Sequence, residues 1–166
     1  MPVLRRTRKK KDKFWPHKYY RGLTKKQALE RKKEINKFGA MKANDPKAYV
    51  GFKTDAYATR KKKSSYTVQW NTLFPDAKSL KERSQVTGVP LKYIKHIQRK
   101  AYAAWRSGHR PGASQAQWTY PRISSFLLCG KAHYTADAAV VRRAKKESAK
   151  ARKWFTRCKP SKLTSI

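Results

Sequence analysis

The sequence contains very few acidic residues. Only 9 aspartates and glutamates stand against 43 lysines and arginines in 166 residues, which gives a formal net charge of +34. A soluble chain with this charge repels itself unless it lies against a dense anion such as nucleic acid, a phospholipid surface or an acidic protein. The acids are also scattered, and no two are spaced as a pair for general acid–base chemistry. The composition predicts an anionic partner and argues against catalysis.

Cysteine is scarce as well, because only Cys129 and Cys158 occur. Two isolated cysteines do not form a disulfide framework, so we expect a reducing setting and a thiol in a helical core for Cys129. A zinc site built from both cysteines and His133, with His109 or His17, is disfavoured because structural zinc uses closely spaced ligand pairs. We therefore expect no metal and no other cofactor.

Long apolar runs and enzyme motifs are also missing. No apolar run approaches the roughly 20 residues that a membrane-spanning helix needs. No glycine-rich phosphate loop, metalloprotease helix or nucleophile elbow occurs. Met1–Lys13 lacks the apolar stretch of a secretory signal, while its basic character leaves a nuclear or organelle address open. We expect a protein that is not an enzyme and has no small-molecule substrate.

The residues that are present predict a mainly α fold. With 39% hydrophobic and 12% aromatic residues, the chain has enough apolar material to fold. We expect a small multi-helix module, with a helix-turn-helix-like pair, an extended basic arm and an extended loop. The predicted segments are a basic and aromatic arm over 1–23, a helix in 24–39, an extended basic linker over 40–64, a helical domain over 65–158 and a tail over 159–166.

Capping and stop signals place the individual helices. Thr24 with Gln27 and Ser79 with Glu82 have capping-box spacing, and glycines or prolines follow the apolar periodic stretches. The predicted helices are 25–38, one from Ser65 to before Pro75, a short one to Thr87, a long one from Pro90 to Gly108, one from Ser114 to Cys129 with a kink or division at Pro121, and a last helix capped by Thr135 with Asp137 in its first turn.

The segment Arg83–Ile97 is the most specific local pattern. It places a small residue four positions before Gly88, an apolar residue directly after it, and apolar residues six and nine positions after it. This spacing seats the second helix of a helix-turn-helix on the first, which would turn Lys92, Lys95 and His96 toward a DNA groove. The alternative is packing alone, since many helical proteins join two helices through a glycine turn.

The aromatic residues of the arm also allow two interpretations. Phe14, Trp15, Tyr19 and Tyr20 alternate with cations. Such rings can stack on bases or pack into a groove of a partner. Equally, they can anchor the arm on the protein's own core, because exposed aromatic clusters are normally covered.

The candidate binding residues are cations in two extended segments and on helix faces. Arg106, His109 and Arg110, around Gly108 and Gly112, are compatible with an anion-binding elbow and equally with cations that interact with the dipole of a helix C-terminus. The residues expected to contact an anionic partner are Arg5, Arg6, Arg8, Lys9, Lys10, Lys11, Arg60, Lys61, Lys62, Lys63, Lys92, Lys95, Arg99, Arg106, His109, Arg110, Arg142 and Arg143.

About fifty residues of the chain carry a resemblance to a known group of proteins. The matching residues are Gly88-Val89-Pro90-Leu91, Ala103-Ala104-Trp105-Arg106, Gly108-His109-Arg110-Pro111-Gly112-Ala113, Gln117-Trp118, Arg122, Ser125-Phe126-Leu127, Gly130-Lys131 and Thr135-Ala136-Asp137. They resemble a family of small basic proteins, without an assigned activity, encoded by large double-stranded DNA viruses of algae and protists, the chlorella viruses and their relatives. The resemblance implies a setting in the virion and in the virus factory of the host cell.

In that setting we expect a structural virion protein. The first expectation is a minor capsid protein that cements capsid components through basic arms and helix faces. Its partners would be other capsid proteins and also DNA or the phospholipid head groups of an inner membrane. One alternative is a DNA-binding protein that condenses the genome, which the charge supports strongly. A second is a ribosomal-type RNA-binding protein, which fits the composition but not the viral resemblance.

Overall fold

The computed structural model describes residues 16–57 and 63–159, and within them every regular element is helical and no strand occurs. The α-helices are α1 (Lys25–Gly39), α2 (Ser65–Leu73), α3 (Leu80–Thr87), α4 (Leu91–Ala104), α5 (Gln115–Leu127), α6 (Lys131–Tyr134), α7 (Ala138–Glu147) and α8 (Ala149–Phe155). Three 3-10 helices, η1 (His17–Tyr19), η2 (Pro46–Tyr49) and η3 (Lys53–Tyr57), accompany α1, and the π-helix η4 (Trp105–His109) extends α4. The mainly α prediction is confirmed.

Three of the helices begin where short-range capping signals predict. Thr24, Ser79 and Ser114 each cap a helix, and each forms a reciprocal capping box with the residue three positions later. Gly88 ends α3 with a φ of 71°, the left-handed conformation that glycine adopts without steric cost. Pro121 lies inside α5, which runs through it as a single helix rather than dividing in two.

Two predicted segments differ from the structure. Residues 40–57 are not extended: the Asp45 side chain accepts a hydrogen bond from the Lys47 N–H at the start of η2, and Ala48 and Thr54 are buried. The predicted last helix is divided into α7 and α8, because Ser148 leaves the helical conformation and its hydroxyl accepts a hydrogen bond from the Ala151 N–H. A short-range cap at Ser148 causes the second difference, whereas Glu34 of α1, which accepts hydrogen bonds from Lys53 and Thr54, contributes to the first.

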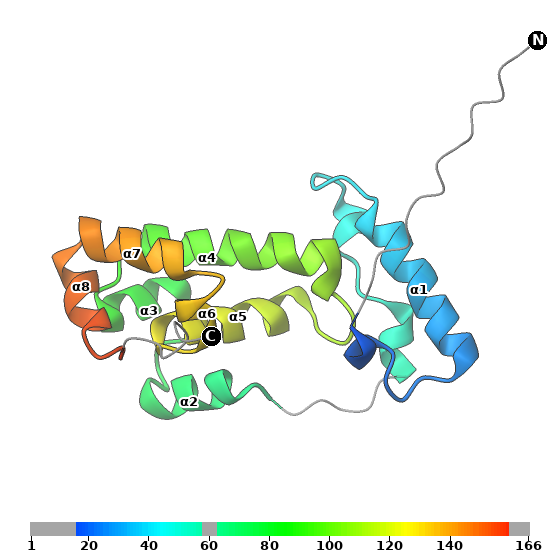
Figure 1. Cartoon of the computed structure of the whole chain (residues 1–166), viewed down its shortest axis with the longest axis horizontal. Helices are drawn as coiled ribbons and strands as arrows, with labels where there is room; N and C mark the ends of the chain where they lie inside the picture. Colours follow the sequence, from blue (N-terminus) through cyan, green and yellow to red (C-terminus); the bar gives the residue numbers. More distant parts are fainter. Residues whose placement is uncertain (1–15, 58–62, 160–166) are drawn as a thin grey trace, which may run out of the picture.

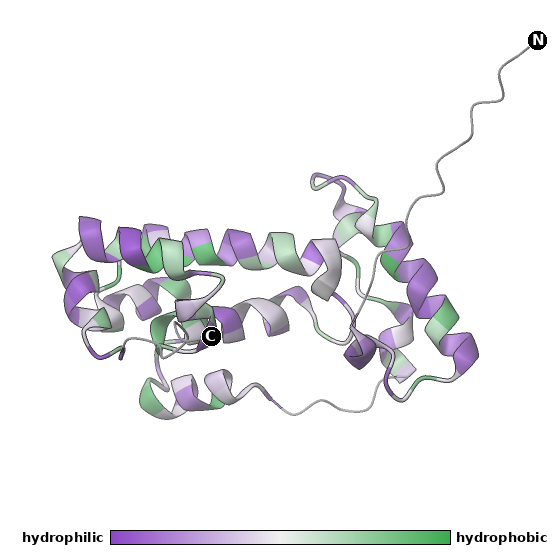
Figure 2. Ribbon diagram, viewed as in Figure 1, coloured by the Kyte–Doolittle hydropathy of each residue, from purple (hydrophilic) through white to green (hydrophobic). Residues whose placement is uncertain are grey.

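The main core lies between α2, α3, α4, α5, α7 and α8. Figure 1 shows α4 and α5 as two long helices, with the C-terminal helices at one end and α1 at the other. Figure 2 shows hydrophilic and hydrophobic residues interspersed along α4, and the buried residues Ile94, Ile97 and Ala101 recur at the three- and four-residue spacing of an amphipathic helix. The core comprises Trp70, Ala77, Val89, Tyr93, Ile94, Ile97, Ile123, Phe126, Leu127, Val140, Val141, Ala144, Ala151, Trp154 and Phe155.

Several polar groups inside this core have partners. The indole N–H groups of Trp70 and Trp154 donate to the carbonyls of Ala77 and Leu127, each at 2.8 Å. Arg83 is 4% exposed and lies over the Trp70 ring, and burial lowers the pKa of its guanidinium to about 10. A cation is therefore part of the core of the helical domain.

A second buried arginine organises the N-terminal segment. All three guanidinium nitrogens of Arg31 are used: Nε donates to Thr54 Oγ1 at 3.0 Å, Nη1 to the Tyr19 carbonyl at 2.9 Å, and Nη2 to Asp55 Oδ1 at 2.7 Å. The same Asp55 oxygen accepts the Gly112 N–H at 2.6 Å. Arg31 thus ties α1, η1 and η3 to the turn between η4 and α5. Of the two interpretations of the arm's aromatic residues, Tyr19, which is 4% exposed, fits the one in which they pack on the protein itself.

The two cysteines form a disulfide bond, so the prediction of a core thiol at Cys129 is wrong. Cys129 lies two residues after the end of α5 and Cys158 follows α8, and their Cα atoms lie 5.3 Å apart although the sequence separation is 29. Helices α6, α7 and α8 lead the chain back to the end of α5. The pairing depends on this path, which the spacing of the two cysteines does not reveal.

Reducing this disulfide is expected to destabilise the protein. In the chain-entropy model, removing a cross-link that closes a loop of 29 residues lowers the free energy of unfolding by about 3 to 4 kcal/mol. Urea denaturation with and without dithiothreitol measures the loss. The double variant Cys129→Ser, Cys158→Ser is the control and should not respond to the reductant. An unchanged wild-type midpoint under reducing conditions would contradict the expectation.

Candidate polyanion-binding surface

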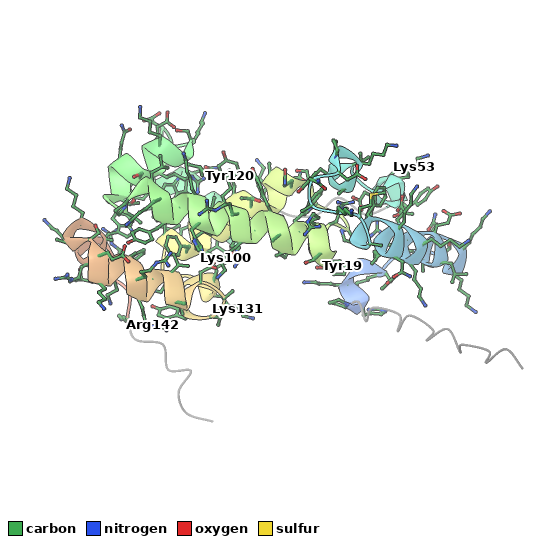
Figure 3. The ribbon with its side chains drawn as sticks, turned by 90° about the horizontal axis from the view of Figure 1, so that it is seen from above. Tyr19, Lys53, Lys100, Tyr120, Lys131 and Arg142 are labelled. Atoms are coloured by element: carbon green, nitrogen blue, oxygen red, sulfur yellow. A yellow bond between two sulfur atoms is a disulfide. The ribbon has the colours of Figure 1, made fainter. Side chains whose placement is uncertain are left out.

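Helices α4 and α7 together expose a row of cations. On α4, Lys92, Lys95 and Arg99 follow each other at three and four residues, so they share one side of the helix, and all three are exposed. Helix α7 packs against α4, and the two lie side by side in Figures 1 and 3. We define the α4–α7 basic face as Lys92, Lys95, Arg99, Lys100, Arg142 and Arg143.

His96 reports how close these cations are to one another. It lies partly buried on α4, and its pKa is lowered first by burial and then by the positive charges of Arg143, Arg99 and Lys100. Cations from both helices therefore act on one imidazole ring. The α4–α7 basic face is a single electrostatic unit rather than two separate helix surfaces.

The acids near this face are already engaged. Glu147 accepts hydrogen bonds from the Tyr93 hydroxyl and from Lys92 Nζ, and these bonds lower the pKa of its carboxyl. By contrast, Lys95, Arg99 and Arg142 have no carboxylate partner within residues 16–57 and 63–159. These three cations are available for an external anion.

The fully buried carboxylate of Asp137 holds the helices below the face together. Arg122 of α5 binds it through Nε at 2.9 Å and Nη2 at 2.6 Å, and Lys100 of α4 binds it through Nζ at 2.9 Å. We predicted Asp137 only as an acid in a first helical turn. Its role in joining α4, α5 and the start of α7 was missed, because the sequence does not show that Arg122 and Lys100 converge on it. Thr135 is not the predicted cap, since its hydroxyl donates to the Lys131 carbonyl.

The helix-turn-helix-like pair is present as a packing unit. Val89, Ile94 and Ile97 are fully buried, as the pattern predicts, and the Ser84 hydroxyl donates to the Val89 carbonyl at 2.7 Å. Lys92, however, is bound to Glu147 of α7. Because α7 packs alongside α4, the first turns of α4 do not project from the protein as a separate recognition helix, although Lys92 and Lys95 are exposed. The arrangement fits the packing interpretation.

Arg106 and Arg110 lie at a different place and in a different environment. Arg110 is 1% exposed and lies between the rings of Phe38, Phe52 and Trp105, whose centroids are 4.8, 5.6 and 4.5 Å from its guanidinium carbon. Arg106 is half-buried and donates to the Met41 carbonyl at 3.2 Å. The expectation that both contact an external partner is corrected for Arg110, because it joins the α1 segment to the end of α4 from inside the protein.

The remaining expected binding residues fall outside this face. His109 belongs to η4, and its side chain lies outside what the structure describes. Lys63 is exposed just before α2. The other expected residues lie outside the described residues: Arg5, Arg6, Arg8, Lys9, Lys10, Lys11, Arg60, Lys61 and Lys62.

Of the residues considered for zinc, Cys129, Cys158 and His133 meet in space, but as a disulfide beside a histidine. The Nδ1 atom of His133 lies 4.0 Å from Cys158 Sγ and 3.0 Å from the Phe126 carbonyl oxygen, and burial lowers the pKa of the imidazole. Within the described part of the chain, no three potential ligands are arranged to hold a metal ion. The same part contains no helix long and apolar enough to span a bilayer.

The fold and the exposed cations define a basic, all-α protein with a candidate polyanion-binding surface. Residues 16–156 match a family of unknown function, DUF5824, and the chain therefore belongs to this family. The match includes α1, the disulfide partner Cys129 and the whole α4–α7 basic face. No match was found among curated proteins or among solved structures.

Removing the charge of Asp137 is expected to destabilise the helical domain. Asp137→Asn keeps the shape of the side chain but leaves Arg122 and Lys100 without their carboxylate. We expect a loss of about 2 to 3 kcal/mol in the free energy of unfolding, because a buried ion pair that loses one partner leaves an uncompensated charge. Urea denaturation measures it. Asp76→Asn, at an exposed aspartate that has no ion pair among the described residues, is the matched control and should leave the midpoint nearly unchanged. Equal effects of the two substitutions would contradict the role of Asp137.

Proposed function

We propose that this protein is a non-enzymatic structural protein that binds double-stranded nucleic acid through its phosphates, using the α4–α7 basic face. The observation that carries the proposal is the row of exposed cations from two packed helices, of which Lys95, Arg99 and Arg142 lack an acid partner among the described residues. Cations in such a row bind a phosphate backbone favourably, because binding releases the counterions that are condensed on it. The net charge of +34 adds long-range attraction.

The composition of the face favours a duplex over a single strand. Neither α4 nor α7 exposes an aromatic ring, since Tyr93 is buried and Tyr102 is half-buried. Proteins that bind single strands generally stack bases on exposed aromatic side chains. Contacts from lysine and arginine to phosphates position a protein on a duplex without reading its sequence. We therefore expect binding with little sequence preference.

The biological setting that we propose is the virion of a large double-stranded DNA virus and the virus factory in the host cell. The resemblance of Gly88–Asp137 to proteins of such viruses supports this setting. A protein that binds duplex phosphates without sequence preference would serve there to condense or anchor the genome. The exposed helix faces would meet DNA, and the disulfide-linked core would keep those faces in place.

A minor capsid protein that cements capsid components is the second candidate. The observation that favours it is a set of exposed apolar side chains: Val68 and Leu73 on α2 are 51% and 54% exposed, and Val86 on α3 is 44% exposed. Such side chains suit contact with a protein neighbour better than contact with phosphate. Disrupting virions at high salt separates the candidates. A genome-bound protein should leave with the DNA, whereas a capsid component should stay in the emptied shells at fixed stoichiometry.

The nucleic-acid proposal predicts a specific change in salt dependence. The triple variant Lys95→Ala, Arg99→Ala, Arg142→Ala should bind a short mixed-sequence DNA duplex more weakly. The slope of log K against log salt should fall in magnitude by about 0.9 for each lost phosphate contact, so by about 2.7 in total. Fluorescence anisotropy over a series of salt concentrations measures it, with an RNA duplex of the same length as the comparison for the RNA-binding alternative.

A matched variant separates the face from the overall charge. Lys25→Ala, Lys26→Ala, Lys33→Ala removes the same charge from exposed positions of α1, at the other end of the molecule. This control should keep nearly the wild-type slope. If both triple variants lose the same slope, the binding belongs to the diffuse charge of the protein and not to the α4–α7 basic face, which would sink the proposal.

A further inference from the structure

Arg110 is a buried cation whose hydrogen-bonding capacity is unused. Its side chain is 1% exposed, and within the described residues none of Nε, Nη1 and Nη2 has a hydrogen-bond partner. A guanidinium carries five N–H donors, and leaving charged donors unpaired away from water is costly. Arg31, equally buried, has a partner for each of its three nitrogens. The comparison shows that this fold can satisfy a buried guanidinium with protein groups, and that it does not do so at Arg110.

The aromatic rings around Arg110 stabilise its positive charge but do not accept hydrogen bonds from its N–H groups. Phe38, Phe52 and Trp105 all lie within cation–π distance of the guanidinium carbon. Their π faces attract the positive charge. They do not supply a lone pair to the N–H groups, which point outward in the plane of the guanidinium. The donor edge of Arg110 therefore still needs an acceptor.

A second cation stands beside it, and among the described residues no acid shifts its pKa. Burial lowers the pKa of Arg110 first, and the positive charge of Arg106 lowers it further. Arg106 donates through Nη1 to the Met41 carbonyl, a neutral acceptor that leaves its charge uncompensated. The positive charges of Arg106 and Arg110 therefore repel each other at the junction of α1 and η4. An anion is the species that removes this repulsion.

A small cavity lies at the junction. Its lining includes Arg106, Ser107, Gly108 and Arg110 from the end of α4 and Phe38 and Phe52 from the α1 segment, and it includes no acid. The cavity offers about 10 Å³ to the centre of a water-sized particle, which is room for about one such particle. Phosphate and sulfate, with four oxygens each, are too large for this space.

We propose that this cavity binds one small monovalent inorganic anion, chloride, held by Arg110 and Arg106, and that the anion fastens the α1 segment to the helical domain. Charge-assisted hydrogen bonds from both guanidinium groups would hold it. Chloride is a single atom only slightly larger than a water molecule, so it comes much closer to the size of the cavity than the oxyanions do, and the two guanidinium groups in the lining supply the positive charge. This site is separate from the α4–α7 basic face and does not depend on nucleic-acid binding.

The anion would stabilise the folded protein, because the unfolded chain has no such site. Thermal unfolding of the full chain in sodium chloride and in sodium gluconate, at one constant ionic strength, measures this. At a chloride concentration ten times the dissociation constant we expect the midpoint to be about 3 to 6 °C higher than in gluconate. Arg110→Met, which keeps a long unbranched side chain without the charge, should abolish this chloride-specific increment.

The controls remove general salt effects. Arg99→Met carries the same change on the exposed side of α4 and should keep the wild-type increment. Sodium sulfate at the same ionic strength should give the same shift in the wild type and in Arg110→Met. A chloride increment that is equal in the wild type and in Arg110→Met overturns the proposal, and so does a site-dependent increment that sulfate produces as well as chloride.

A second variant covers the case in which Arg110→Met does not fold. Arg106→Gln removes the neighbouring charge but keeps an N–H donor for the Met41 carbonyl. It should lower the chloride affinity several-fold and broaden the chloride NMR resonance less than the wild type does at equal protein concentration. Wild-type line broadening in Arg106→Gln, together with an unchanged chloride increment, would also overturn the proposal.

Discussion

Repulsion between like charges is the constraint on which the rest of this structure depends. Helices α4 and α7 are both rich in cations, yet they pack side by side. The buried carboxylate of Asp137 makes this possible, because it binds Arg122 and Lys100 at the point where α5, α4 and the start of α7 meet. Glu147 does the same at the surface with Lys92. In a chain with so few acids, each of these two carboxylates offsets the repulsion of more than one neighbour.

The interior deals with positive charge in three different ways. Arg31 is satisfied by hydrogen bonds to a hydroxyl, a carbonyl and a carboxylate. Arg83 combines one hydrogen bond, from Nη1 to Ser124 Oγ at 2.9 Å, with the face of Trp70. Arg110 has aromatic rings alone among the described residues. Arginine tolerates these positions because its charge is delocalised and weakly hydrated, whereas a lysine in the same places would lose its proton more readily.

The parts of the fold that could be predicted from the sequence are those that short-range contacts decide. The capping boxes at Thr24, Ser79 and Ser114 and the left-handed Gly88 depend on residues three to five positions apart, and all are present. The disulfide, the buried Arg31 and the Asp137 cluster depend on segments that meet only after folding. Of the candidate site, the row on α4 followed from helical spacing. Helical spacing did not show that α7 packs against the His96 side of α4 or that Arg110 is buried. Neither feature depends on the local sequence.

The distribution of cations, more than their number, therefore decides what the protein can bind. Buried arginines contribute to the net charge, but they are enclosed by the fold and do not reach a polyanion. The cations that matter for a polyanion are those held on rigid helices, close together and without an acid partner among the described residues, as are Lys95, Arg99 and Arg142 of the α4–α7 basic face. Repulsion between these closely spaced cations raises the free energy of the folded protein. The carboxylates of Asp137 and Glu147 offset this repulsion, and the disulfide adds stability to the same helical domain. A bound phosphate backbone would relieve the same repulsion, so folding and binding are driven by one electrostatic requirement.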